Sequence, residues 1–282
     1  MGEYSLTVII PNYNKEKYIL KCIDSVMGQT YDISEIIIVD DCSTDQSPEV
    51  IRKIARENPK IHPVFLKQNQ GVSHARNVGI AECRSEYITF LDSDDYYGNK
   101  DKLMNEMVMI KQDQVSNVLA YSKLAFCDES GENIWQPNMK RRSYLEGNVY
   151  HRLVSGNFEF STITRDYCIK KSILVDVGGY NEKKCLYEDL ELLIKLSRKC
   201  RFACTMEQGS VYRQNTNGLS NRTSKELDYA LREVLNEGMT DLSQADQIII
   251  VWMKCMKKVK TTYLVALFGA KKAVKKIIAR VS

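Results

Sequence analysis

Short apolar runs alternate with amphipathic segments along the first third of the chain. The apolar runs are rich in Ile and Val and have the length of buried β-strands; they occupy residues 6–11, 35–41, 61–67 and 86–91. The amphipathic segments repeat apolar side chains every three or four positions, which predicts helices over 15–29, 47–58 and 71–83. Strands and helices that alternate over short connections favour a doubly wound sheet with helices on both faces. The predicted fold class is therefore α/β, with a Rossmann-like, mostly parallel sheet.

Polar and acidic residues follow three of these strands, at the edge where open parallel sheets bind their ligands. They occupy positions 11–14, 40–43 and 92–95. Asp, Asn and Ser also cap helices and form turns, which accounts for Ser43, Thr44 or Asp45. The segment 92–95 holds more carboxylates than one cap needs, so we interpret it as part of a site.

Three carboxylates in this segment, Asp92, Asp94 and Asp95, would repel one another, and each resists ionisation beside the others. A divalent cation among them removes that cost. Ligands that are all oxygen favour Mg²⁺ or Mn²⁺ over zinc, and such ions complete their coordination with substrate phosphates. The chain contains neither GxxxxGK[ST] nor GxGxxG after a strand, which argues against P-loop proteins and dinucleotide oxidoreductases.

The cysteine and histidine content argues against two other kinds of site. Nine Cys are scattered without a CxxC pair, and the chain has three His, so a zinc site is not expected. Reduced, buried thiols in a cytoplasmic protein explain this pattern better. The N-terminus lacks the features of a signal peptide, and no apolar run reaches the length of a membrane-spanning helix.

The positive charge of the chain is concentrated at its C-terminal end. Nine Lys and Arg residues follow Asp246, so residues 1–246 carry a net charge of −5 although the whole chain carries +4. Residues 262–282 predict a helix with apolar side chains on one face and basic side chains on the other. Such a helix can bind an anionic membrane surface or pack on the body with its lysines in water. No module for nucleic-acid binding accompanies it.

Five segments resemble the successive signatures of the family-2 nucleotide-sugar glycosyltransferases of bacterial surface-polysaccharide type, which have the GT-A fold. They are TVIIPNYN, IIIVDDCSTD, NQGVSHARNVGI, ITFLDSDDYY and VGGYNEKKCLYEDLELLIKLS. The resemblance spans roughly residues 4–215. It implies a GT-A domain over 1–222, with a nucleotide-sugar half at 1–97 and an acceptor half at 98–222. A helical extension over 223–282 would follow and end in the basic tail.

The resemblance also implies which residues bind the donor. Pro11 and Tyr13 would line the nucleotide base, and Asp40 would accept a hydrogen bond from uracil or thymine. Asp94 of the DxD motif would be the principal metal ligand, and Asp92 would contact the ribose or the metal shell. The remaining donor-binding residues would be Asp41, Arg76, Ser93, Asp95 and Arg213.

On the acceptor side, the resemblance implies that Asp189 is the general base, with Glu188 beside it. A positioned carboxylate that takes the proton of an acceptor hydroxyl typically contributes about 10²–10⁴-fold in rate. One base opposite the leaving group implies direct displacement with inversion. The same two acids would also complement the dipole of a helix that begins there. Asn215 stands where family members often have a metal-contacting His, so Arg213 is expected to carry more of the diphosphate contact.

The expected function is therefore the metal-dependent, inverting transfer of one sugar from a nucleoside-diphosphate sugar, with UDP as the expected nucleotide. The acceptor would be a glycan or lipid-linked saccharide in surface-polysaccharide assembly. The expected location is the cytoplasm or the inner face of the plasma membrane. Two alternatives stay open: a non-catalytic nucleotide-sugar binding subunit, and a sugar-phosphate nucleotidyltransferase. The second normally has a Gly-rich N-terminal signature, which IIPNYNKEKY lacks.

Overall fold

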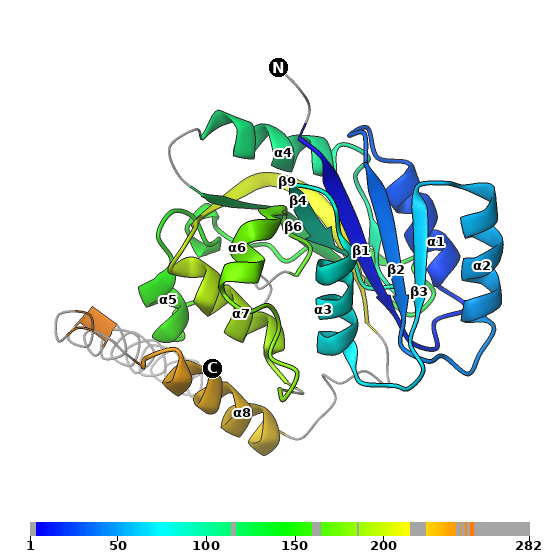
Figure 1. Cartoon of the computed structure of the whole chain (residues 1–282). Coiled ribbons are helices and arrows are strands. Elements are labelled where there is room, and N and C mark those ends of the chain that lie inside the picture. The colour runs from blue at the N-terminus through cyan, green and yellow to red at the C-terminus, as the bar shows by residue number, and fades with distance from the viewer. Residues whose placement is uncertain are drawn as a thin grey trace, which may run out of the picture.

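The larger of the two sheets in the described part of the chain takes most of its strands from the N-terminal half of the sequence (Figure 1). The computed structural model describes residues 4–113, 117–159, 165–184, 186–214, 224–240, 243, 246 and 249–250. The sheet has the strand order β3–β2–β1–β4–β8. Its strands are β1 (Leu6–Asn12), β2 (Glu35–Asp40), β3 (Ile61–Phe65), β4 (Tyr87–Phe90) and β8 (Ile169–Lys170). The first four are parallel and β8 is antiparallel to β4, which confirms the mostly parallel α/β sheet.

Helices cover both faces of this sheet, as the alternation of side chains along its strands requires. Val8 and Ile10 of β1 pack toward one face, and Ile9 packs toward the other. The first face is covered by α1 (Ile19–Met27), α2 (Ser47–Glu57) and α4 (Lys102–Gln112). The second is covered by α3 (Val72–Glu82), α6 (Lys171–Asp176) and α7 (Glu188–Ser197). The three helices predicted from periodicity are confirmed, although α1 begins four residues later than expected.

A second, smaller sheet carries the part of the chain in which the sequence showed no clear period. Its order is β5–β9–β6–β7. The strands are β5 (Tyr96–Tyr97), β6 (Val118–Cys127), β7 (Ile134–Trp135) and β9 (Arg201–Arg213). β6 and β9 pair in parallel over most of their length. A short 3-10 helix (Arg141–Ser143), α5 (Tyr150–Val154) and α8 (Ser224–Glu237) complete the described elements, and α8 packs on α5 and α7.

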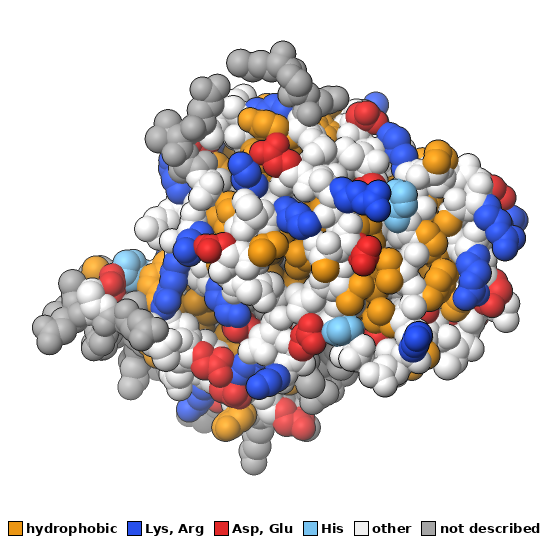
Figure 2. All heavy atoms as spheres, in the orientation of Figure 1, with side chains coloured by type: hydrophobic (Ala, Val, Ile, Leu, Met, Phe, Trp, Pro, Cys, Tyr) orange, Lys and Arg blue, Asp and Glu red, His pale blue; other side chains and the backbone are white. Residues whose placement is uncertain are grey.

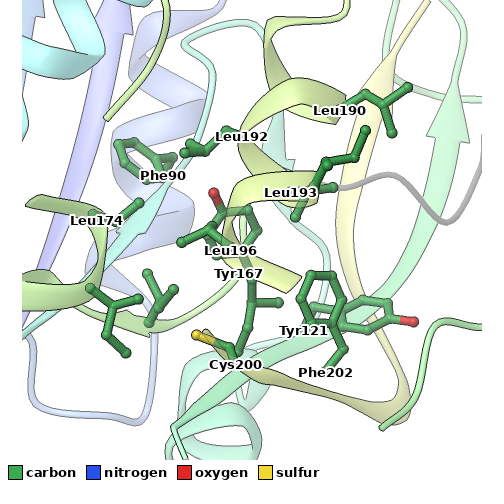
Figure 3. Close-up of a cluster of buried hydrophobic side chains, with 14 of the residues drawn as sticks. Phe90, Tyr121, Tyr167, Leu174, Leu190, Leu192, Leu193, Leu196, Cys200 and Phe202 are labelled. Carbon is green, nitrogen blue, oxygen red and sulfur yellow. The ribbon is translucent and has the colours of Figure 1, made fainter. Parts of the chain in front are cut away.

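An apolar cluster around α7 joins the two sheets (Figure 3). Four leucines of this helix are 1% exposed or less: Leu190, Leu192, Leu193 and Leu196. Because they lie on several sides of the helix, α7 is buried around most of its circumference. Phe90 of β4, Tyr167 and Phe202 of β9 pack into the same cluster. This packing fixes the first turn of α7, which carries Glu188 and Asp189, relative to β4.

The outer surface around α3 and α6 carries basic and acidic side chains intermixed, with hydrophobic side chains between them (Figure 2). Among the described residues, no helix is long and apolar enough to cross a membrane. The basic helix predicted for 262–282 lies outside the described residues, and so does Asn215. Of the extension predicted for 223–282, the structure describes α8 and a few residues after it.

Gly79 lets α3 lie directly against β1. A Cβ atom at this position would approach Cγ2 of Ile9 to 2.4 Å, closer than real Cβ contacts allow. Because Arg76 lies one turn earlier on the same helix, this close approach also determines how deeply the Arg76 side chain is buried.

We therefore expect Gly79→Leu to lower the free energy of unfolding by about 1–3 kcal/mol through overpacking, measured by urea unfolding. Ala81→Leu is the matched control, because it adds a leucine on the exposed face of the same helix. The control should stay within about 0.5 kcal/mol of the wild-type chain. Equal losses in the two variants would show that contact with β1 is not the constraint at position 79.

Candidate functional site

The ends of β1 and β2 form one wall of the candidate site. Asn12 and Asp40 are register partners, and the Asn12 Nδ2 donates to Asp40 Oδ2 over 2.7 Å. The other Asp40 oxygen accepts the Ser43 backbone N–H at 2.9 Å, which closes a tight turn after β2. Pro11 is buried in β1, whereas Tyr13 is 44% exposed and has a ring face available to a ligand. Pro11, Tyr13 and Asp40 thus all lie at this edge of the sheet, and their contacts with a base stay a prediction.

Asp41 holds the loop that leads into α3. Its two oxygens accept the backbone N–H groups of Gln70, at 2.9 Å, and Gly71, at 2.7 Å. Gly71 has φ of +90°, a conformation that residues with a Cβ rarely adopt. Asp41 therefore helps to place the start of α3, and its predicted contact with the donor stays a prediction.

The acidic cluster follows β4 directly. Asp92, Asp94 and Asp95 each place a carboxylate oxygen within 4.8 Å of the others. Lys15 donates to Asp94 Oδ2 over 2.6 Å. The Arg213 backbone N–H donates to Asp95 Oδ1 at 2.8 Å, and the Arg213 Nε donates to the backbone carbonyl of Asp94. Three carboxylates this close together could hold a divalent cation, because Mg²⁺ and Mn²⁺ prefer oxygen ligands.

Asp95 is the buried member of this cluster and lies beside the charges of Asp92 and Asp94. Burial, then the charges of Asp94 and Asp92, raise the pKa of Asp95 well above its usual value, although Arg165 and the Arg213 N–H oppose the shift. The charged form of Asp95 is therefore disfavoured in this cluster.

Arg76 of α3 connects this cluster to the first turn of α7. Its side chain is fully buried. One terminal nitrogen donates to Asp92 Oδ1 at 2.9 Å, and the other lies 3.3 Å from Glu188 Oε1 and 3.2 Å from Asp189 Oδ1. The guanidinium also lies 4.9 Å from the ring centre of Tyr180. Arg76 thus contacts carboxylates of both motifs, and its predicted contact with the donor stays a prediction.

Arg165 makes a second connection between the same two groups. It forms an ion pair with Asp92 Oδ2, and its Nε lies 3.5 Å from Asp189 Oδ2. Its guanidinium lies 5.3 Å from the ring centre of Tyr212. Burial acts to raise the pKa of Asp92, but Arg165 and Arg76 outweigh it and hold that pKa well below its usual value. Both oxygens of Asp92 thus face a guanidinium.

Glu188 and Asp189 occupy the first turn of α7, after Tyr187 in a left-handed conformation with φ of +59°. Acidic residues in the first turn complement the helix dipole, and this alone would explain their position. Burial, followed by the charge of Asp189, raises the pKa of Glu188, although Arg76 and Arg165 partly offset the shift. The contacts with the buried Arg76 and the partly buried Arg165 go beyond what a helix dipole requires.

Two cations of the site were missed by the sequence analysis. Lys15 directly follows the quoted segment TVIIPNYN, so its place beside that motif was the available signal. Arg165 lies in a stretch with no helical or strand period, and nothing in the sequence marked it. Ser93 is buried between the carboxylates. A small pocket opens beside the cluster and is lined by Leu91, Asp92, Asp95, Leu124, Arg165, Asp166, Ser210 and Tyr212.

Comparison with known proteins agrees with the family resemblance. The model of the family described as Glycosyl transferase family 2 matches residues 7–173. An uncharacterised glycosyltransferase of Haemophilus influenzae is 39% identical over 149 residues, which cover 51% of this chain and 58% of that protein. A putative teichuronic acid biosynthesis glycosyltransferase of Bacillus subtilis, TuaG, is 36% identical over 121 residues, covering 43% and 48% respectively. The chain spans about half the length of these two relatives.

The structure is also similar to that of S. aureus TarS. The crystal structure of TarS residues 1–349 in complex with UDP-GlcNAc matches with a TM-score of 0.70 at 22% sequence identity. The match covers 87% of this chain and 70% of the TarS chain. At that identity the likeness establishes the fold, and it confirms the predicted GT-A architecture.

The raised pKa of Asp95 predicts how stability depends on pH. An unfolded Asp titrates near pH 4, roughly. Because the folded pKa is higher, stability falls as pH rises from there through the folded pKa, and the full penalty applies above it. We expect Asp95→Asn, which keeps an acceptor for the Arg213 N–H, to unfold at higher urea than the wild-type chain at pH 8 in EDTA.

The difference should shrink as the pH falls to below roughly 4, where both states of the wild-type chain hold the proton. Asp24→Asn removes an exposed carboxylate of α1 and should leave the pH profile unchanged. An Asp95→Asn variant that is less stable than wild type at pH 8 would contradict the repulsion argued here.

Proposed function

Since the chain belongs to glycosyltransferase family 2, we propose that it transfers one sugar from a UDP-sugar, with inversion, to a saccharide or lipid-linked acceptor of a surface polysaccharide. The observation that carries this proposal is the double bridge of Arg76 and Arg165 between Asp92 and Asp189. It joins a carboxylate of the DxD motif to the carboxylate that would activate the acceptor.

A uridine nucleotide fits the wall formed by the ends of β1 and β2. Tyr13 offers an exposed ring for stacking, and Asp40 is held rigidly by Asn12 and Ser43. TarS has been crystallised with UDP and with UDP-GlcNAc. TuaG is named for teichuronic acid biosynthesis. These relatives support a UDP-sugar donor and a role in surface-polysaccharide assembly for this chain.

Asp94 and Asp92 would hold Mg²⁺ or Mn²⁺, with Asp95 beside them. Such an ion supplies charge neutralisation for the departing nucleoside diphosphate. The Lys15 ammonium group already lies at Asp94, and Arg213 lines the other side of the cluster. Both side chains would lie near the diphosphate of a donor bound at these carboxylates. They would add positive charge on the leaving-group side of the reaction.

Asp189 would accept the proton of the acceptor hydroxyl while that oxygen bonds to the anomeric carbon and the bond to diphosphate breaks. Arg76 and Arg165 contact different oxygens of Asp189, so its carboxylate is held in one orientation. Glu188 shares Arg76 and would help to position that arginine. Attack from the side opposite the diphosphate inverts the anomeric configuration.

The proposal also covers the domain organisation of the chain and its location in the cell. Residues 1–222 would form the GT-A domain, with donor binding in 1–97 and acceptor binding in 98–222. Residues 223–282 would form an extension whose basic end binds the inner face of the plasma membrane. The alternatives, a non-catalytic binding subunit or a nucleotidyltransferase, do not explain why Asp189 is tied to the DxD motif.

Donor binding can be tested by thermal shift with UDP, GDP, dTDP and CDP sugars, with and without Mn²⁺. We expect a UDP-sugar to raise the melting temperature in the presence of Mn²⁺, because a ligand that binds only the folded state stabilises it. Asp94→Asn should lose this response, and Asp24→Asn should retain it. A full response in Asp94→Asn would remove Asp94 from the metal site.

The acceptor side can be tested with Asp189→Asn. This variant should keep the thermal response to the UDP-sugar and Mn²⁺ but lower the rate of sugar transfer by about 10²–10⁴-fold, because the general base is lost. Asp176→Asn, at an exposed carboxylate of α6, is the matched control. Transfer at the wild-type rate by Asp189→Asn would exclude it as the base, and anomeric analysis of the product would test inversion.

A further inference from the structure

Three aromatic side chains form a row across the smaller sheet. Phe126 of β6 is the register partner of Trp135 in β7 and of Tyr212 in β9. The rings of Phe126 and Trp135 are stacked, with centres 6.0 Å apart. The rings of Phe126 and Tyr212 meet edge to face at 5.8 Å. Because paired residues on neighbouring strands point to the same side, the three rings share one face of the sheet.

The inner end of this aromatic row reaches the candidate active site. Tyr212 lines the pocket beside Asp92 and Asp95, and the Arg165 guanidinium lies 5.3 Å from its ring centre. Arg165 in turn contacts Asp189. Leu124, two positions before Phe126 on the same face of β6, lines the pocket as well. The row is therefore continuous with the place where an acceptor hydroxyl would react.

The outer end of the row lies at the surface. Trp135 is 43% exposed on a two-residue edge strand, and Phe126 and Tyr212 are partly buried. The turn before Trp135 is polar: Asp128 accepts hydrogen bonds from the Ser130 hydroxyl and from the Asn133 side chain. A narrow line of rings between this polar turn and Arg165 lacks the broad apolar area that a lipid or protein partner would cover.

We propose that the aromatic row is the acceptor-saccharide subsite. The apolar faces of acceptor sugar rings would stack on Trp135, Phe126 and Tyr212, while the reacting hydroxyl reaches Asp189 past Arg165. The row thus receives the sugar units that lie beyond the one being modified. This inference rests on the proposed function and deepens it, because it names the residues that would bind the acceptor saccharide.

The test uses the full chain on an array of bacterial and synthetic oligosaccharides, with UDP and Mn²⁺ present, and titrates the strongest binder. We expect the wild-type chain to bind at least one oligosaccharide and Trp135→Ala to bind it about tenfold or more weakly. Trp135→Phe, which keeps a ring, should retain most of the affinity. Ile134→Ala is the matched control, since Ile134 is 52% exposed on the same strand but pairs with Cys127.

The thermal response to UDP and Mn²⁺, recorded for every variant, separates this inference from the proposed function. An intact UDP response with no glycan binding by the wild-type chain, or with equal binding by Trp135→Ala, overturns the subsite alone. Binding to phosphatidylglycerol vesicles that Trp135→Ala loses, without glycan binding, would assign the row to a membrane surface instead. A missing UDP response in the wild-type chain contradicts the proposed function itself.

Discussion

The burial of the Arg76 guanidinium constrains the rest of this structure. A charge with no exposed surface is tolerated only where carboxylates surround it, and removing one member of such a buried pair typically costs about 3–5 kcal/mol. The partners of Arg76 come from opposite halves of the described chain: Asp92 after β4, and Glu188 and Asp189 at the start of α7. Their charge pairing therefore places the proposed donor and acceptor groups beside each other.

The charges around Arg76 also bear on the proposed binding of a cation followed by a diphosphate. Five carboxylates meet there: Asp92, Asp94, Asp95, Glu188 and Asp189. Four cations accompany them: Lys15, Arg76, Arg165 and Arg213. If every group is charged, the formal sum is −1, and a divalent cation changes it to +1. Under the proposed function, a site of this kind would attract first the metal and then the anionic donor.

Each part of the structure could be predicted only where the residues that form it lie close together in the sequence. The parallel sheet and its helices were predictable because each element carries its own period of apolar residues. The acidic cluster was predictable because its carboxylates are contiguous. Lys15 and Arg165 were not, since they meet Asp94 and Asp92 across separations of 79 and 73 residues. Arg76 was recognised from its motif, but its contacts with the carboxylates depend on how closely α3 packs on β1.

The smaller sheet is still harder to predict from the sequence. β6 and β9 lie side by side although α5, α6 and α7 separate them in the chain, and no local pattern specifies their register. That register aligns Phe126 with Tyr212, and the pairing of β6 with β7 extends the line of rings to Trp135. The proposed donor side of this fold depends on short motifs at the ends of consecutive strands. The proposed acceptor side depends on long-range pairing, so its residues are brought together only once the sheet is assembled.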